Sequence, residues 1–154
     1  MKNLIIFILC LSITNVHGQL NKSIWKSSLC QFGAGFADGA NQAYLFHYSK
    51  SGLFEKWNIK PNSVAWENKW AKDENGNPIV GQERFWQSSR ALVFLTDFHH
   101  STRFATNRLN EGTLLVYAIG HGRKRKKWYW YLADLGIMFT AKSAGFYTSY
   151  ELIF

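Results

Sequence analysis

The sequence predicts a mostly α-helical protein, a single-domain helical bundle that follows an N-terminal signal peptide. Three observations support this fold class. Apolar residues recur at helical spacing in several long segments. Turn-forming residues are concentrated in one region, near 49–86, and Pro61 and Pro78 are the only two prolines of the 154 residues. Residues 19–154 are enough for one domain and too few for two.

Residues 1–18, MKNLIIFILCLSITNVHG, have the pattern of a secretory signal peptide. Lys2 precedes an apolar run at 4–13, and small residues lie before the expected cleavage point. The run is about half of the ~20 residues that a membrane-spanning helix needs, so a retained anchor is the alternative. Removal of this segment leaves Cys30 as the only cysteine, which rules out an internal disulfide in the mature domain. We therefore expect an exported protein of the periplasm or cell envelope.

The first helix is predicted at 31–48, where Phe36, Ala40 and Tyr44 share a stripe. Its three glycines each destabilise a helix by about 1 kcal/mol relative to alanine, so they indicate close contact with another helix. The region near 49–86 is predicted to be a loop-rich insertion that contains one short helix, VAWENKW.

A second long helix is predicted at about 87–108, with a turn at Asn-Glu-Gly 110–112. The following segment, TLLVYAIGHG, is too short to cross a bilayer. WYWYLADLGIMFTAKSAGF (128–146) is predicted to be another helix, and FYTSYELIF (146–154) either a terminal strand or a buried helical end.

A cluster of polar side chains interrupts the apolar pattern at LTDFHHSTRFATN. On a helix Asp97 and His100 point the same way, and Asp38 and His47 on the first helix are candidates to meet them. The simplest interpretation is a buried structural network of these four residues, with His47 alternatively capping its helix. A metal site with His47, Asp97 and His100 as ligands, or a catalytic or ligand-binding site, is the alternative.

The basic run RKRKK abuts the aromatic segment WYWY. Cations attract an anionic surface, and Trp and Tyr favour the boundary between lipid and water. A solvated turn before a core helix is the alternative interpretation. The formal net charge of +8 also suits anionic lipid or an envelope polymer as partner, whereas export and the lack of a nucleic-acid motif argue against nucleic acid. The residues of the run are Arg123, Lys124, Arg125, Lys126 and Lys127.

Three segments together resemble a group of small proteins without an established activity, found mainly in Bacteroidetes and their phages. They are ADGANQAYLFHY, VAWENKW and SSRALVFLTDFHH, in that order. The resemblance implies a helical protein at or near a membrane, and it marks Asp38, His47, Asp97 and His100 as one spatial cluster. The matching positions are Asp38, His47, Tyr48, Trp66, Asn68, Lys69, Thr96, Asp97 and His100.

Several enzyme classes lack their motifs in this chain. It has no Gly-rich phosphate loop, no GxSxG nucleophile elbow and no CxxC pair. We therefore expect a membrane-associated envelope protein without enzymatic activity and without a cofactor. The alternatives are a metal-assisted hydrolase that acts on an envelope lipid or polymer, and a module that binds anionic surfaces through residues 123–127.

Overall fold

The structure, a computed structural model, describes residues 20–50, 52–121 and 125–154. The predicted signal peptide therefore lies outside the described residues. The described chain is mostly α-helical, as predicted, and has one small antiparallel sheet. Its elements in chain order are α2 (Ile24–Phe46), α3 (Leu53–Lys56), α4 (Asn62–Ala65), η2 (Trp66–Lys69), β1 (Trp70–Lys72), β2 (Pro78–Glu83), η3 (Val93–Leu95), α5 (Phe98–His121), α6 (Trp128–Tyr147) and η4 (Thr148–Ile153).

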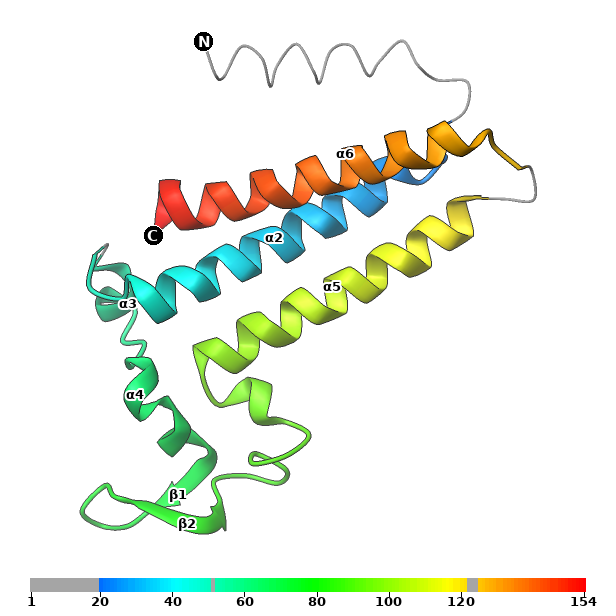
Figure 1. Cartoon of the computed structure of the whole chain (residues 1–154). Coiled ribbons are helices and arrows are strands. Elements are labelled where there is room, and N and C mark those ends of the chain that lie inside the picture. Colours follow the sequence, from blue (N-terminus) through cyan, green and yellow to red (C-terminus); the bar gives the residue numbers. More distant parts are fainter. Residues whose placement is uncertain (1–19, 51, 122–124) are drawn as a thin grey trace.

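The three long helices lie side by side, with α2 between α6 and α5 (Figure 1). Two of the three glycines of the first predicted helix, Gly35 and Gly39, lie at the contact with α6, whereas Gly33 faces Leu109 of α5. A Cβ at Gly35 would be 1.9 Å from the Lys142 carbonyl oxygen, and a Cβ at Gly145 would be 2.0 Å from that of Phe32. The two backbones therefore approach so closely that only glycine fits, which confirms the predicted close helix contact.

The predicted bounds of the second long helix, 87–108, are wrong, because α5 begins eleven residues later, at Phe98. The Asp97 carboxylate accepts a hydrogen bond from the His100 backbone N–H, 2.9 Å away, and so satisfies one of the free N–H groups of the first turn. The predicted turn at 110–112 is also wrong. α5 continues through it to His121, and the Gln31 side chain donates hydrogen bonds to Asn110 and Thr113 from α2.

The loop-rich region contains more regular structure than the sequence predicts. The expected short helix is present as α4 and η2, and it leads directly into the hairpin of β1 and β2. The hairpin turn is held by the Asp73 carboxylate, which accepts backbone hydrogen bonds from Asn75 and Asn77 at 2.9 and 2.7 Å. Gly76, with a φ of +83°, supplies the left-handed residue of this turn.

The main aromatic core lies where the C-terminal end of α2 meets α3, the start of α5 and the C-terminus. Tyr44 and Phe54 are fully buried at its centre. Phe98 packs on both rings, and Phe154 stacks on Phe54 with 4.8 Å between ring centroids. The terminal segment is a helical end, η4, and not a strand, but it is buried at Ser149 and exposed at Leu152 and Ile153.

Candidate functional site

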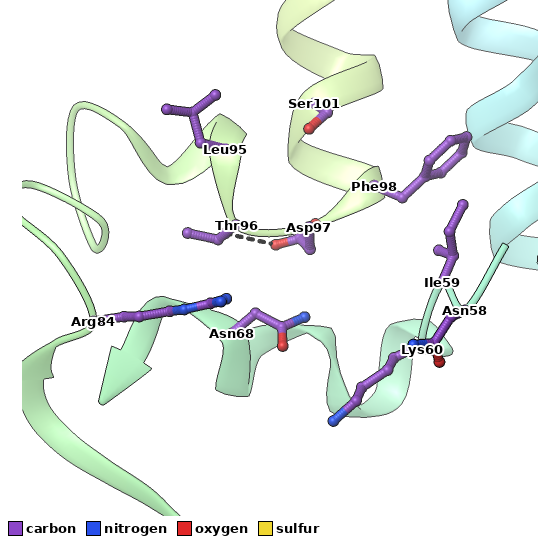
Figure 2. Close-up of a pocket in the computed structure, with 10 residues that line it drawn as sticks. All are labelled: Asn58, Ile59, Lys60, Asn68, Arg84, Leu95, Thr96, Asp97, Phe98 and Ser101. Atoms are coloured by element: carbon purple, nitrogen blue, oxygen red, sulfur yellow. Dashed lines mark hydrogen bonds between the residues drawn. The ribbon is translucent and has the colours of Figure 1, made fainter. Parts of the chain in front are cut away.

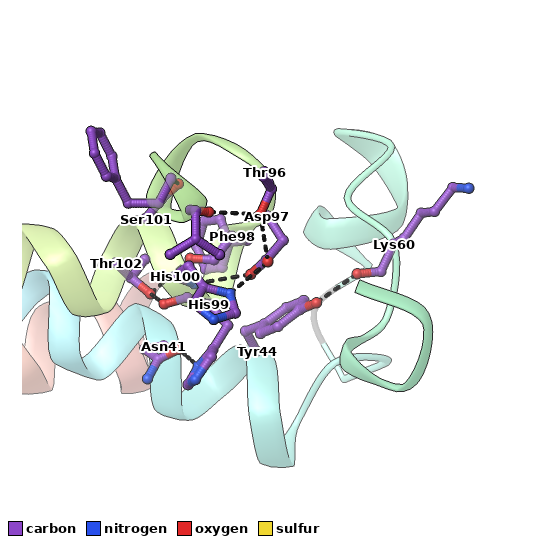
Figure 3. Close-up of polar contacts among 12 residues, drawn as sticks. Asn41, Tyr44, Lys60, Thr96, Asp97, Phe98, His99, His100, Ser101 and Thr102 are labelled. Atoms are coloured by element: carbon purple, nitrogen blue, oxygen red, sulfur yellow. Dashed lines mark hydrogen bonds and ion pairs between the residues drawn. The ribbon is translucent and has the colours of Figure 1, made fainter. Parts of the chain in front are cut away.

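Asp97 and His100 form the hydrogen-bonded pair that the sequence predicts. The His100 Nδ1–H donates to Asp97 Oδ2 at 2.6 Å, and the same carboxylate caps the first turn of α5 (Figure 3). The Asp97 side chain is 3 % exposed and that of His100 is 42 % exposed. The buried carboxylate thus has partners for both oxygens, and its first role is to begin the helix and fix the imidazole.

His99 points to α2 and not to this pair. Its Nδ1–H donates to the Asn41 Oδ1 at 2.8 Å (Figure 3). Burial lowers the pKa of the His99 imidazole from its ordinary value, and the nearby His100 and Arg103 lower it further. The ring is therefore held neutral in the contact between α2 and α5.

Stability is expected to fall on acidification because of His99. The unfolded chain binds a proton at this residue below a pH of about 6.5, whereas the folded chain binds it only at lower pH. The free energy of unfolding should therefore decrease as the pH falls from 7.5 towards the lowered pKa of the folded state. Urea denaturation at pH 7.5, 6.5 and 5.5 should give a shallower dependence for His99→Gln than for the natural protein. If the free energy of unfolding depended on pH in the same way for His99→Gln and the natural protein, this role of His99 would be contradicted.

The other two members of the predicted polar cluster are not bonded to Asp97 or His100 among the described residues. His47 is the C-cap residue of α2, and its Nε2 shares a hydrogen bond with the Tyr150 hydroxyl. Asp38 lies nine residues earlier on α2, about 13 Å along the helix axis. The hydrogen bonds and ion pairs of the described chain join neither residue to Asp97 or His100. Within residues 20–50, 52–121 and 125–154, no three His, Cys, Asp or Glu side chains are grouped to hold a metal ion.

A second buried polar group, which we call the Asp134 cluster, joins the other end of the helices. Asp134 is fully buried. Its carboxylate forms an ion pair with Lys126 and accepts hydrogen bonds from the Tyr117 hydroxyl at 2.8 Å and the Asn21 backbone N–H at 3.3 Å. Burial, followed by the hydrogen bond to Asp134, raises the pKa of the Tyr117 hydroxyl, which keeps it a donor. The cluster thus connects the start of α2, the end of α5 and the start of α6.

The Asp134 cluster changes the interpretation of the basic run. Lys126 was expected to face an anionic surface, but its side chain is only 9 % exposed and turns inward to Asp134. Arg125 and Lys127 are exposed, and Arg123 and Lys124 lie outside the described residues. Exposed Lys22 and Lys26, at the start of α2, lie at the same end of the molecule because Asn21 contacts both Tyr117 and Asp134.

Large apolar side chains cover the outer face of α6. Trp128, Leu132, Leu135 and Phe139 follow one another at spacings of four, three and four, so they form one stripe along the helix. We call these four residues the α6 stripe. They are between 56 % and 73 % exposed, which is unusual for side chains of this size in one row. Leu114, Leu115 and Ile119 are similarly exposed on the outer part of α5.

Two cavities adjoin each other between the hairpin region and the start of α5. The first, of about 380 Å³, is shown in Figure 2, where Arg84 and Asn68 extend towards the wall formed by Thr96 and Asp97. The second, of about 440 Å³, lies on the hairpin side and shares Lys60, Asn68 and Arg84 with the first. The sequence did not single out Lys60 or Arg84, because isolated cations in a loop-rich region give no periodic signal.

Neither a family model, a curated protein nor a solved structure matches this chain. The resemblance to the Bacteroidetes group therefore stays a prediction. In the described ranges 20–50, 52–121 and 125–154, no helix has both the length and the hydropathy required to cross a bilayer.

Proposed function

We propose that this protein is an exported, non-enzymatic component of the cell envelope that lies on an anionic membrane surface, with the α6 stripe in contact with lipid. The observation that carries the proposal is the row of four large, exposed apolar side chains on α6, beside a cationic end of the molecule. Full burial of one such side chain is worth about 1.5–3 kcal/mol, so leaving the row in water is costly.

The charged and aromatic residues around the stripe suit the boundary between water and lipid. Trp25, Trp128 and Tyr129 are exposed at the end of the molecule that also carries Lys26 and Lys127. Lys26 lies 5.4 Å from the Trp25 ring and Lys127 lies 6.0 Å from that of Tyr129. Trp and Tyr rings concentrate at the headgroup level, and each nearby cation adds about 1 kcal/mol of attraction to anionic lipid.

The interior of the helical layer supports the same proposal. The contact between α2 and α6 is made by Gly35, Gly39 and Gly145, and Ser149 is buried beside them. Small residues inside and large apolar residues outside are typical of helices that pack in contact with lipid. An envelope polymer would be held mainly by charge and would leave the α6 stripe in water, so lipid is the favoured partner.

Sedimentation with liposomes tests the proposal. We expect the protein to bind vesicles that contain phosphatidylglycerol more tightly than neutral phosphatidylcholine vesicles, and less tightly at high salt. The double variant Leu135→Gln/Phe139→Gln should bind the anionic vesicles at least about tenfold more weakly, because two side chains no longer enter the lipid.

The matched control is Val80→Gln/Trp86→Gln, which replaces two apolar residues in and just after the hairpin that are at least as exposed as Leu135. This variant should bind vesicles as the natural protein does. Equal weakening by both double variants would contradict the role of α6. A second result would also contradict the proposal. If the natural protein formed a stable dimer and bound no vesicles, and the α6 double variant were monomeric, a second copy of the chain would cover the stripe.

A further inference from the structure

The cavity on the hairpin side has an unusual chemical composition. It is lined by three cationic side chains, one amide and one indole, with no carboxylate among them. The five residues come from a short part of the chain that the sequence predicts to be mostly loop. They are Lys60, Asn68, Trp70, Lys72 and Arg84.

The hairpin explains why these side chains converge. Trp70 and Lys72 are two residues apart on β1, and both line the cavity. Arg84 follows β2 directly and donates its backbone N–H to the Lys69 carbonyl at 3.1 Å, which places it beside β1. Lys60 is fixed from the other side, because its carbonyl accepts a hydrogen bond from the buried Tyr44 hydroxyl at 2.7 Å.

Two of the three cations of this cavity, Lys60 and Arg84, have no ion-pair partner among the described residues. The Glu83 carboxylate accepts hydrogen bonds from Ser89 and from the Gln87 N–H, at 2.8 Å to the latter. The Asp97 carboxylate is paired with His100. Lys72 has a distant ion pair with Glu67, at 3.8 Å. Among the ion pairs of the described residues, none includes Arg84 or Lys60.

We propose that this cavity binds a phosphate monoester, held by Arg84, Lys60 and the Asn68 amide. A phosphate monoester carries a charge of about −1.5 to −2 at pH 7, which matches two unpaired cations better than a carboxylate does. The planar guanidinium donates two parallel hydrogen bonds to phosphate oxygens. Trp70 offers a flat apolar wall for the organic part of the ligand, and the volume of about 440 Å³ accommodates more than the phosphate alone.

This proposal is independent of the lipid contact made by α6. The cavity lies at the end of the helices where α2 finishes and α5 begins, whereas Trp128 and the exposed cations lie at the opposite end (Figure 1). The phosphate monoester has two sources, a small soluble metabolite or the headgroup of a lipid such as phosphatidic acid. The experiment therefore uses both.

Calorimetric titration of the full chain with glycerol 3-phosphate, at fixed ionic strength and with acetate as the reference anion, tests the soluble source. Vesicles that contain phosphatidic acid, compared with phosphatidylglycerol vesicles of equal surface charge, test the headgroup. We expect a preference for the monoester in at least one of these arms. In that arm, Arg84→Gln and Lys60→Gln should each weaken binding by about tenfold or more, because each removes a charged hydrogen bond.

Arg90→Gln is the matched control, because Arg90 is an exposed arginine of the next loop that lines neither cavity. It should bind the monoester as the natural protein does, and all three variants should keep the natural helical circular dichroism. The proposal is overturned if neither arm distinguishes the monoester from its reference. It is also overturned if Arg90→Gln weakens binding as much as Arg84→Gln. Arg84 lies outside the α6 stripe, so the two proposals can fail separately. If the natural protein did not bind phosphatidylglycerol vesicles, only the membrane proposal would be contradicted.

Discussion

Replacing Gly35 or Gly145 by alanine is expected to destabilise the protein by more than about 3 kcal/mol, because the new methyl group meets backbone atoms that cannot rotate away. The added Cβ would be 1.9 Å from the Lys142 carbonyl oxygen in the first case and 2.0 Å from that of Phe32 in the second. Both positions are in regular helix, so the helices have to move apart. Urea denaturation followed by circular dichroism measures the loss.

Gly112 and Gly136 provide the matched controls. Both lie inside long helices, and a Cβ at either position meets no atom within 4 Å. Alanine at these positions should raise stability by about 0.5–1 kcal/mol, because it restricts the unfolded chain and favours helix. If Gly35→Ala behaved as Gly136→Ala does, α2 and α6 would not be in the close contact described above.

The contact between α2 and α6 also links the fold to the proposed function. Because Gly35 and Gly145 turn the small faces of both helices inward, the large side chains of α6 are left on the outer face. A variant that separates the helices is therefore expected to lose the ordered α6 stripe together with its stability. A variant of the stripe itself, such as Phe139→Gln, should leave the free energy of unfolding nearly unchanged, because the replaced side chain is 73 % exposed.

The sequence predicts the bounds of α6 well, because 128–146 is a long apolar segment without strong interruption. It predicts that α2 exists but places its start at 31, seven residues after the observed start at Ile24. The sequence places the start of α5 incorrectly, because the helical spacing of apolar residues continues across residues that form turns. The apolar residues at 91–95 share the helical spacing of Phe98 and Phe104, yet Asp97 caps a new helix between them. Asp97 is itself a start signal that the sequence contains, because Asp is favoured immediately before the first residue of a helix.

The polar sites show a different limit. Asp97 and His100 were found because their interaction is local, at a spacing of three residues. The Asp134 cluster was missed because it joins three elements that are distant along the chain. Lys126 looks the same as its neighbours in RKRKK, and only its ion pair with Asp134 distinguishes it from them. Spacing along one element therefore predicts pairs within that element, whereas pairs between elements require the coordinates.

Replacing Lys126 by methionine is expected to cost about 3–5 kcal/mol, because it leaves the Asp134 carboxylate buried without its cation. Asp134 is fully buried on α6. Tyr117 and Asn21 still donate hydrogen bonds to it, but they carry no charge. Lys127→Met is the matched control, since Lys127 is exposed and should change stability by less than about 0.5 kcal/mol.

Asp134→Asn should cost less than Lys126→Met, although both remove the same ion pair. The lysine has a long flexible chain near the end of the molecule, so its ammonium group can turn to water when the carboxylate is lost, whereas Asp134 is fixed inside. The double variant Lys126→Met/Asp134→Leu should be more stable than Lys126→Met, since neither charge is then left buried alone, although Tyr117 and Asn21 lose their acceptor. Equal stability of Lys126→Met and Lys127→Met in urea denaturation would show that Lys126 is free in solution. In that case Lys126 would belong to the exposed basic run that the sequence predicts.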